Sequence, residues 1–389
     1  MWVMNSTSIE QFSVDVADDV LVDLRERLAR TRWPDQMADT GWSYGSDLAY
    51  VQELCAYWLS EFDWRAAERR LNAWPQYSTD IDGQLIHFIH ARSRHEHAKP
   101  LILTHGWPGS VAEFLKILGP LVEPEAFGGD ASDAFHVVAP SMPGYGFSGP
   151  TTKPGWDIRK VAETNAALMA RLGYERYGAQ GGDWGGICTS IMGHIDPDHL
   201  IGIHMNMLVA GPPTGAENPM EGVQEHEMGY LADAMAFQGD GTGYQEIQST
   251  RPQTLAYGLT DSPSGLAAWI VEKFRAWSDC NGDVESRFTK DELLTNIMIY
   301  WVTGTINSST RLYCESKRSG SFGLAKGRVD VPTGGIVFPK EIYKSPRVWA
   351  EAAFNVTHWT VADSGGHFAA MEEPVALVQS MREFFAPLH

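Results

Sequence analysis

The sequence predicts an α/β protein with a mostly parallel central sheet and helices on both faces. Apolar runs at residues 101–104 and 135–139 each precede a glycine- and proline-rich turn, as buried parallel strands do. Helical patterns such as residues 158–172 alternate with these runs. The 389-residue chain is 43% apolar, which is enough for a large buried core. These observations together favour one sheet that is interrupted by insertions.

Helical patterns also precede and interrupt the predicted sheet. Residues 15–32 and 47–72 have apolar positions at helical spacing, and Asp82-Gly83 marks a hairpin turn where the sheet begins. Further strands are expected at residues 335–338 and 358–362, before a closing helix at 373–385. The expected division is a helical extension at 1–76, core at 77–207, a helix-rich and aromatic lid at 208–325, and core at 326–389.

Composition excludes several classes of function. The formal net charge of −19 disfavours nucleic acid and anionic membranes as partners and favours a neutral small molecule. Four widely spaced cysteines suggest reduced thiols in the cytoplasm, and neither a metal site nor a cofactor is expected. The first twelve residues resemble neither a signal peptide nor a membrane span, so we expect a soluble protein with no membrane anchor. The sequence leaves a homodimer open.

The strongest local signal is GGDWGG at residues 181–186, between a strand pattern and a helix pattern. A nucleophile on a sharp strand-to-helix turn needs small neighbours, so the motif predicts a nucleophile elbow with Asp183 in place of serine. The alternative is a simple helix N-cap, which is the more frequent meaning of Gly-Asp before a helix.

A second motif, THGWPGS at residues 104–110, follows the first parallel strand. This loop is expected to donate one oxyanion-hole N–H group, from Trp107. Trp184, directly after the nucleophile, is expected to donate the other from the helix N-terminus. His105 is interpreted as structural.

The base and its acid partner are expected near the C-terminus. His367 lies in a glycine loop after the last strand and just before the last helix, and hydrolase triads run in the order nucleophile, acid, histidine. Glu341 follows the preceding strand and is our choice of acid. Asp330 precedes that strand, and Asp363 shares the loop of the histidine, so neither has the expected position.

With these motifs, and with GGHFAA at residues 365–370, the chain resembles the microsomal-type epoxide hydrolases over roughly residues 10–387. Lid segments typical of that family are STRP at 249–252, DSPSGLAA at 261–268 and YWVTGTI at 300–306. The resemblance implies an α/β-hydrolase fold and a reaction that opens an epoxide with water. The anchored relatives begin with a transmembrane segment that this sequence lacks, so membrane residence is not carried over.

The resemblance also implies that two lid tyrosines bind the epoxide oxygen, and the matching positions in this sequence are Tyr244 and Tyr313. Tyr257 and Tyr300 are the nearest alternative tyrosines in the sequence. Without the family pattern, a lid tyrosine would more often have a packing role than a catalytic one. The implied mechanism forms a covalent ester on Asp183, which is cleaved by water that the His367–Glu341 pair activates. The aromatic lid suggests an apolar or aryl epoxide.

Two alternative functions stay open at this point. A haloalkane dehalogenase also uses an aspartate elbow and an ester, although halide release favours indole N–H donors over tyrosine hydroxyls. A non-catalytic ligand-binding protein could use the same scaffold. A serine esterase is set aside, because no GxSxG motif occurs in the chain.

Overall fold

The structure, a computed structural model, describes residues 8–323 and 327–388. Most of the N-terminal segment MWVMNSTSIEQF, which was expected to be neither a signal peptide nor a membrane span, lies outside the described residues. The expected boundary between residues 325 and 326 also lies outside them.

The fold is α/β with a mostly parallel sheet and helices on both faces, as predicted. In the described residues the sheet has nine strands in the order β1-β2-β3-β5-β4-β6-β7-β8-β9. The pairs from β1 to β5 are antiparallel, and the pairs from β5 through β4 to β9 are parallel. The strands are β1 (Ile9–Phe12), β2 (Gln76–Ile81), β3 (Gln84–Ala91), β4 (Lys99–Thr104), β5 (Phe135–Pro140), β6 (Tyr177–Gly181), β7 (Leu200–Met205), β8 (Val329–Val337) and β9 (Phe354–Val361).

The predicted hairpin is confirmed at β2 and β3. Asp82 and Gly83 both have positive φ angles, 56° and 81°, as the favoured two-residue hairpin turn requires. The Asp80 carboxylate accepts a hydrogen bond from the Gly83 N–H group. Strand β1 was not predicted, because its four residues lie at the exposed edge of the sheet and lack a buried apolar face.

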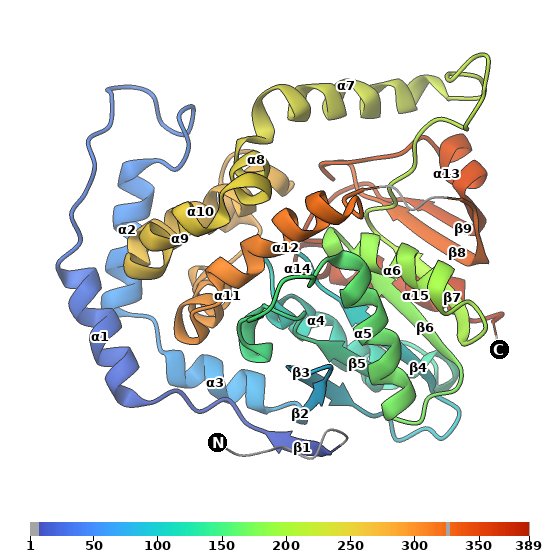
Figure 1. Ribbon diagram of the computed structural model, residues 1–389, viewed down its shortest axis with the longest axis horizontal. Coiled ribbons are helices and arrows are strands. Elements are labelled where there is room, and N and C mark those ends of the chain that lie inside the picture. Colours follow the sequence, from blue (N-terminus) through green and yellow to red (C-terminus); the bar gives the residue numbers. More distant parts are fainter. Residues whose placement is uncertain (1–7, 324–326, 389) are drawn as a thin grey trace.

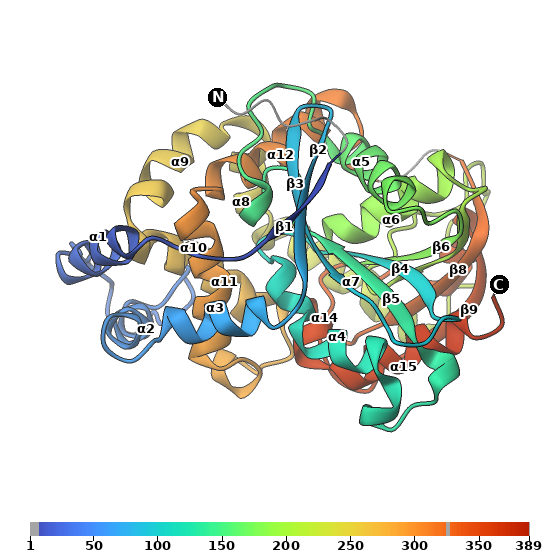
Figure 2. The same cartoon turned by 90° about the horizontal axis from the view of Figure 1, so that it is seen from below.

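Side chains alternate between two apolar layers along the parallel strands. In β4, Leu101 and Leu103 belong to the layer beneath α4 (Leu115–Val122) and α15 (Pro374–Phe385). Ile102 belongs to the layer beneath α5 (Ile158–Arg171) and α6 (Trp184–Ile195). Figure 2 shows these two pairs of helices on opposite sides of the sheet. This two-sided burial explains why the strands read as continuous apolar runs.

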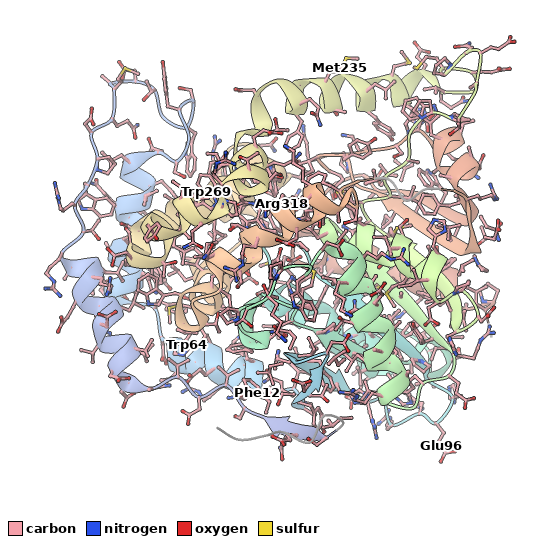
Figure 3. All side chains as sticks on the ribbon, in the orientation of Figure 1. Phe12, Trp64, Glu96, Met235, Trp269 and Arg318 are labelled. Atoms are coloured by element: carbon pink, nitrogen blue, oxygen red, sulfur yellow. The ribbon has the colours of Figure 1, made fainter. Side chains whose placement is uncertain are left out.

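A helical insertion joins β7 to β8. Its helices are α7 (Met228–Ala236), α8 (Gly243–Thr250), α9 (Pro252–Asp261), α10 (Pro263–Trp277), α11 (Lys290–Thr303) and α12 (Ile306–Ser319). Helices α8 to α12 form a layer beside the N-terminal helices, whereas α7 crosses the top of the view in Figure 1. Helix α7 has no buried residue, and Met235 lies on its outer side (Figure 3).

The other α-helices of the described residues are α1 (Asp18–Ala29), α2 (Leu48–Ser60), α3 (Trp64–Asn72), α13 (Arg347–Ala353) and α14 (Ala369–Glu372). Of these, α1, α2 and α3 pack against α10 and α11 of the insertion, α13 packs against β9, and α14 packs beside α15. The expected helical stretch 47–72 is therefore two helices, with Asp47 capping the first through the Tyr50 N–H group. Across residues 8–323 and 327–388, every helix is too short or too polar to cross a bilayer.

Candidate active site

Asp183 lies at the sharp turn between β6 and α6. Its backbone has φ 51° and ψ −130°, a region that side-chain-bearing residues rarely adopt. Glycine neighbours make the turn sterically feasible: a Cβ atom on Gly185 would lie 1.8 Å from the Thr104 carbonyl oxygen. Asp183 occupies the N-cap position of α6, yet its side chain makes no capping hydrogen bond. Asp183 is therefore the N-cap residue by position, but its carboxylate does not cap the helix and is directed elsewhere.

The HGWPGS loop supplies the partner of this carboxylate. The Trp107 N–H group donates to Asp183 Oδ1 over 2.8 Å. Gly106 packs so tightly here that a Cβ atom would lie 2.3 Å from Asp183 Oδ1. Trp184 begins α6, so its N–H group belongs to the helix N-terminus. His105 is buried and accepts a hydrogen bond from the Met142 N–H group, which fits a structural role.

His367 faces Asp183 from the loop between β9 and α14. Its Nε2 atom lies 3.3 Å from Asp183 Oδ2, and its Nδ1 atom lies 2.6 Å from Glu341 Oε1. The loops that carry His367 and Glu341 run side by side, since the Lys340 N–H group donates to the Gly365 carbonyl oxygen over 3.1 Å. The structure thus brings together the three side chains that the sequence analysis chose.

The competing acids lie elsewhere. Asp330 is near the start of β8, where its side chain is 88% exposed and pairs with Arg328. Asp363 is also exposed. Neither contacts the imidazole of His367 in the ion pairs and hydrogen bonds of the described residues, where the Nδ1 partner is Glu341.

Two carboxylates control the charge of His367. Burial alone would lower the pKa of the imidazole, but Glu341 and Asp183 together raise this pKa well above its ordinary value of 6.5. The two carboxylates therefore favour the protonated form of His367 in the resting site. If Asp183 became a neutral ester, one anion would be lost and the pKa of His367 would fall.

Tyr244 on α8 and Tyr313 on α12 lie with Asp183 around a cavity of about 240 Å³. Both tyrosines are buried, and their ring centroids are 6.0 Å apart. Burial, together with the nearby Asp183 carboxylate, raises the pKa of both hydroxyl groups. Both tyrosines are therefore protonated donors at neutral pH.

The rest of this cavity is mostly apolar. Its other lining residues include Ile187, Met207, Val209, Ala234, Phe237 and Phe322. The two alternative tyrosines do not line this cavity. Tyr257 is 74% exposed, and the Tyr300 hydroxyl donates to the Gly109 carbonyl oxygen. An apolar cavity with a few convergent polar groups is typical of a small-molecule site.

Sequence reasoning missed Glu113, a half-buried residue whose carboxyl group is close enough to His367 and Asp183 to interact electrostatically with both. The signal that could have found it is an acidic residue three positions after the HGWPGS motif, among apolar neighbours. It also missed Phe237 and Phe322 as lining residues, because sequence cannot place lid side chains in space.

The fold and the elbow define an α/β-hydrolase that presents a carboxylate at the turn where the GxSxG elbow of this fold presents serine. The model of the family described as "Epoxide hydrolase N terminus" matches residues 9–114, and that described as "alpha/beta hydrolase fold" matches residues 99–229. A putative epoxide hydrolase of Stigmatella aurantiaca is 47% identical over 381 residues, which cover 98% of this chain and 85% of that protein. The chain belongs to the epoxide hydrolase family.

More distant relatives share the same full-length similarity. Epoxide hydrolase 1 of Sus scrofa is 36% identical over 408 residues, covering 98% of this chain and 89% of that protein. The crystal structure of juvenile hormone epoxide hydrolase from the silkworm Bombyx mori superposes with a TM-score of 0.89 at 32% identity. It covers 98% of this chain and 95% of the solved chain.

Proposed function

We propose that this chain converts an apolar or aryl epoxide and water to a vicinal diol through a covalent ester on Asp183. The observation that carries the proposal is the position of the Asp183 carboxylate. It lies between the Trp107 N–H group and His367 Nε2, and it opens onto a cavity with two tyrosine hydroxyls.

Ester formation needs an aligned anion more than it needs a base. A carboxylate is already ionised at neutral pH, and epoxide opening is a displacement at saturated carbon. Because the Trp107 N–H group holds Oδ1, Oδ2 is the attacking atom. The new Oδ2–carbon bond forms as the epoxide carbon–oxygen bond breaks, and Tyr244 or Tyr313 gives its proton to the departing oxygen.

Ester hydrolysis uses the other groups. Water loses a proton to neutral His367 and attacks Cγ of Asp183, while Glu341 holds the imidazole through Nδ1. The oxyanion that forms at Oδ1 is stabilised by the Trp107 N–H group and, we propose, by that of Trp184. The bond between Cγ and Oδ2 then breaks, His367 gives the proton to Oδ2, and the diol leaves with that oxygen. The new Asp183 carboxyl group gives up its own proton, which restores the tyrosine hydroxyl that was deprotonated during ring opening.

Removing one tyrosine hydroxyl is expected to slow ester formation selectively. Tyr244→Phe and Tyr313→Phe should each lower its rate by about 10²-fold, the usual cost of losing one oxyanion donor. Rapid-mixing single-turnover experiments measure this rate directly. Tyr257→Phe, at an exposed tyrosine outside the cavity, is the matched control and should behave as wild type. Equal rates in all three variants would contradict the assignment.

The pH dependence of ester hydrolysis is expected to follow His367. Only neutral imidazole accepts the proton from water, so the ester should decay faster as pH rises through the pKa of His367 in the ester. That pKa should lie below the pKa in the free enzyme, because the Asp183 anion that raises it has become neutral. Ester decay followed from about pH 5 to 9 tests this. A rate that falls with rising pH would contradict it.

Product analysis separates the proposal from its rivals. Styrene oxide, an aliphatic epoxide and a haloalkane would be incubated with purified protein, and diol and halide would be measured. Halide is measured directly because Trp107 Nε1 is buried without a hydrogen-bond partner in the described residues, and an indole N–H group of this kind can donate to a halide ion. Diol without halide supports the proposal. Halide release, or stoichiometric epoxide binding without diol, would overturn it.

We also propose a cytoplasmic location, which the four buried free cysteines support. Burial raises the pKa of Cys55 and Cys188 to about 12, so neither thiol is primed for oxidation. A homodimer stays a prediction, and sedimentation of the purified protein would test it.

A further inference from the structure

Two cavities meet at Asp183. The first is the 240 Å³ cavity that holds Tyr244 and Tyr313. The second has a volume of about 20 Å³ and is lined by His367 and Glu113, among others. Of the described residues that line them, Asp183 alone is common to both. A single buried water needs roughly 10–15 Å³, so the second cavity fits one water and no epoxide.

The small cavity has the polar lining that a buried water needs, which is two to four hydrogen-bonding partners. His367, Asp183 and Glu113 supply three such groups. Gln180 supplies a fourth: it is 1% exposed, and its Oε1 atom has no hydrogen-bond partner in the described residues. An unpaired buried acceptor is costly, and a water molecule would satisfy it.

Glu113 is held firmly at this cavity by the HGWPGS loop. It belongs to the short helix Val111–Phe114, and its backbone N–H group donates to the Ser110 carbonyl oxygen over 3.0 Å. The carboxyl packs against Gly109 so closely that a Cβ atom there would lie 1.4 Å from Glu113 Oε1. Glycine at position 109 is thus what leaves room for this carboxyl group.

The protonation of Glu113 suits a water partner. Burial raises its pKa to about 8 and Asp183 adds to this effect, although His367 and the Ser110 backbone oppose it. A neutral carboxyl group at pH 7 offers a carbonyl acceptor without adding a third buried anion beside Asp183 and Glu341.

We propose that the small cavity holds the water that cleaves the ester, and that Glu113 accepts one hydrogen of this water while His367 accepts the other. The proposal rests on the proposed ester mechanism and deepens it. The water oxygen forms the bond to Asp183 Cγ, and its proton passes to His367 Nε2 and then to the diol oxygen when the ester bond breaks. Substrate and water thus reach Asp183 from separate cavities, which keeps the large cavity dry for ester formation.

The test compares Glu113→Leu with Glu113→Gln in rapid-mixing experiments that resolve the two half-reactions. Leucine removes the acceptor at similar volume, so ester decay should slow by about 10- to 10²-fold and ester should accumulate, while ester formation stays within about threefold of wild type. Glutamine keeps a neutral acceptor oxygen and should restore decay to within about threefold of wild type.

Three outcomes would overturn the proposal: unchanged ester decay in Glu113→Leu, an equal loss in both half-reactions, or a glutamine variant as slow as the leucine variant. If Glu113→Leu does not fold, a high-resolution crystal structure of the wild-type protein tests whether the small cavity holds the proposed water. Density for a water within hydrogen-bonding distance of both Glu113 and His367 supports the proposal, and its absence overturns it. Failure of the proposed function can be distinguished from failure of the water proposal, because the wild-type protein itself would then form neither ester nor diol.

Discussion

Asp183→Ala is expected to abolish diol formation, with kcat/KM lower by about 10⁴-fold or more, as for other enzymes that lose a nucleophile. Among the described residues that line the larger cavity, no other carboxylate could replace the lost one. Glu341 is turned toward His367 Nδ1, and Glu113 faces the small cavity and is mostly neutral at pH 7. The measurement is steady-state diol production by the purified variant, alongside its thermal unfolding.

Asp330→Ala is the matched control for this loss. Asp330 is an exposed aspartate that pairs only with Arg328 in the ion pairs of residues 8–323 and 327–388, so its removal should leave activity unchanged. An Asp183→Ala variant that kept more than about a tenth of wild-type activity would contradict a covalent role for this residue.

His367→Gln is expected to slow ester hydrolysis strongly while ester formation stays fast. General-base assistance contributes about 10²–10⁴-fold, so steady-state turnover should fall by that factor. Ester formation should continue, because a carboxylate nucleophile needs no general base. Rapid mixing should therefore show one equivalent of epoxide consumed per enzyme, with little diol.

Equal loss of both half-reactions in His367→Gln would argue against this division of roles. His105→Gln is a poor control, since His105 accepts the Met142 N–H group in the core. His199→Gln is a better one, because His199 is an exposed histidine that pairs with Asp196 just before the start of β7, whereas the cavity residues Asn206 and Met207 follow the other end of that strand. It should retain both rates.

The sequence predicted those parts of the structure that depend on local chemistry. Glycines on both sides of Asp183 indicated a strained turn, and the structure gives a reason for them, since any Cβ on Gly185 would meet the Thr104 carbonyl oxygen. Continuous apolar runs indicated parallel strands, because residues such as Leu101 and Ile102 are buried on opposite faces. The fold class followed from these patterns.

What the sequence could not predict depends on contacts between distant segments. Strand β1 exists only because β2 pairs with it, and Glu113 matters only because the loops of Asp183 and His367 enclose it. The roles of Tyr244 and Tyr313 came from resemblance rather than from periodicity. Their position around one cavity with Asp183 is what the structure adds to that resemblance.

The central claim is the covalent ester on Asp183, and intact-protein mass spectrometry of His367→Gln mixed with styrene oxide tests it most directly. We expect the protein mass to rise by one whole epoxide molecule, and peptide mapping to locate the addition on Asp183. Asp183→Ala should show no addition. An unmodified His367→Gln protein that still forms diol, or an adduct at any other residue, would contradict the mechanism.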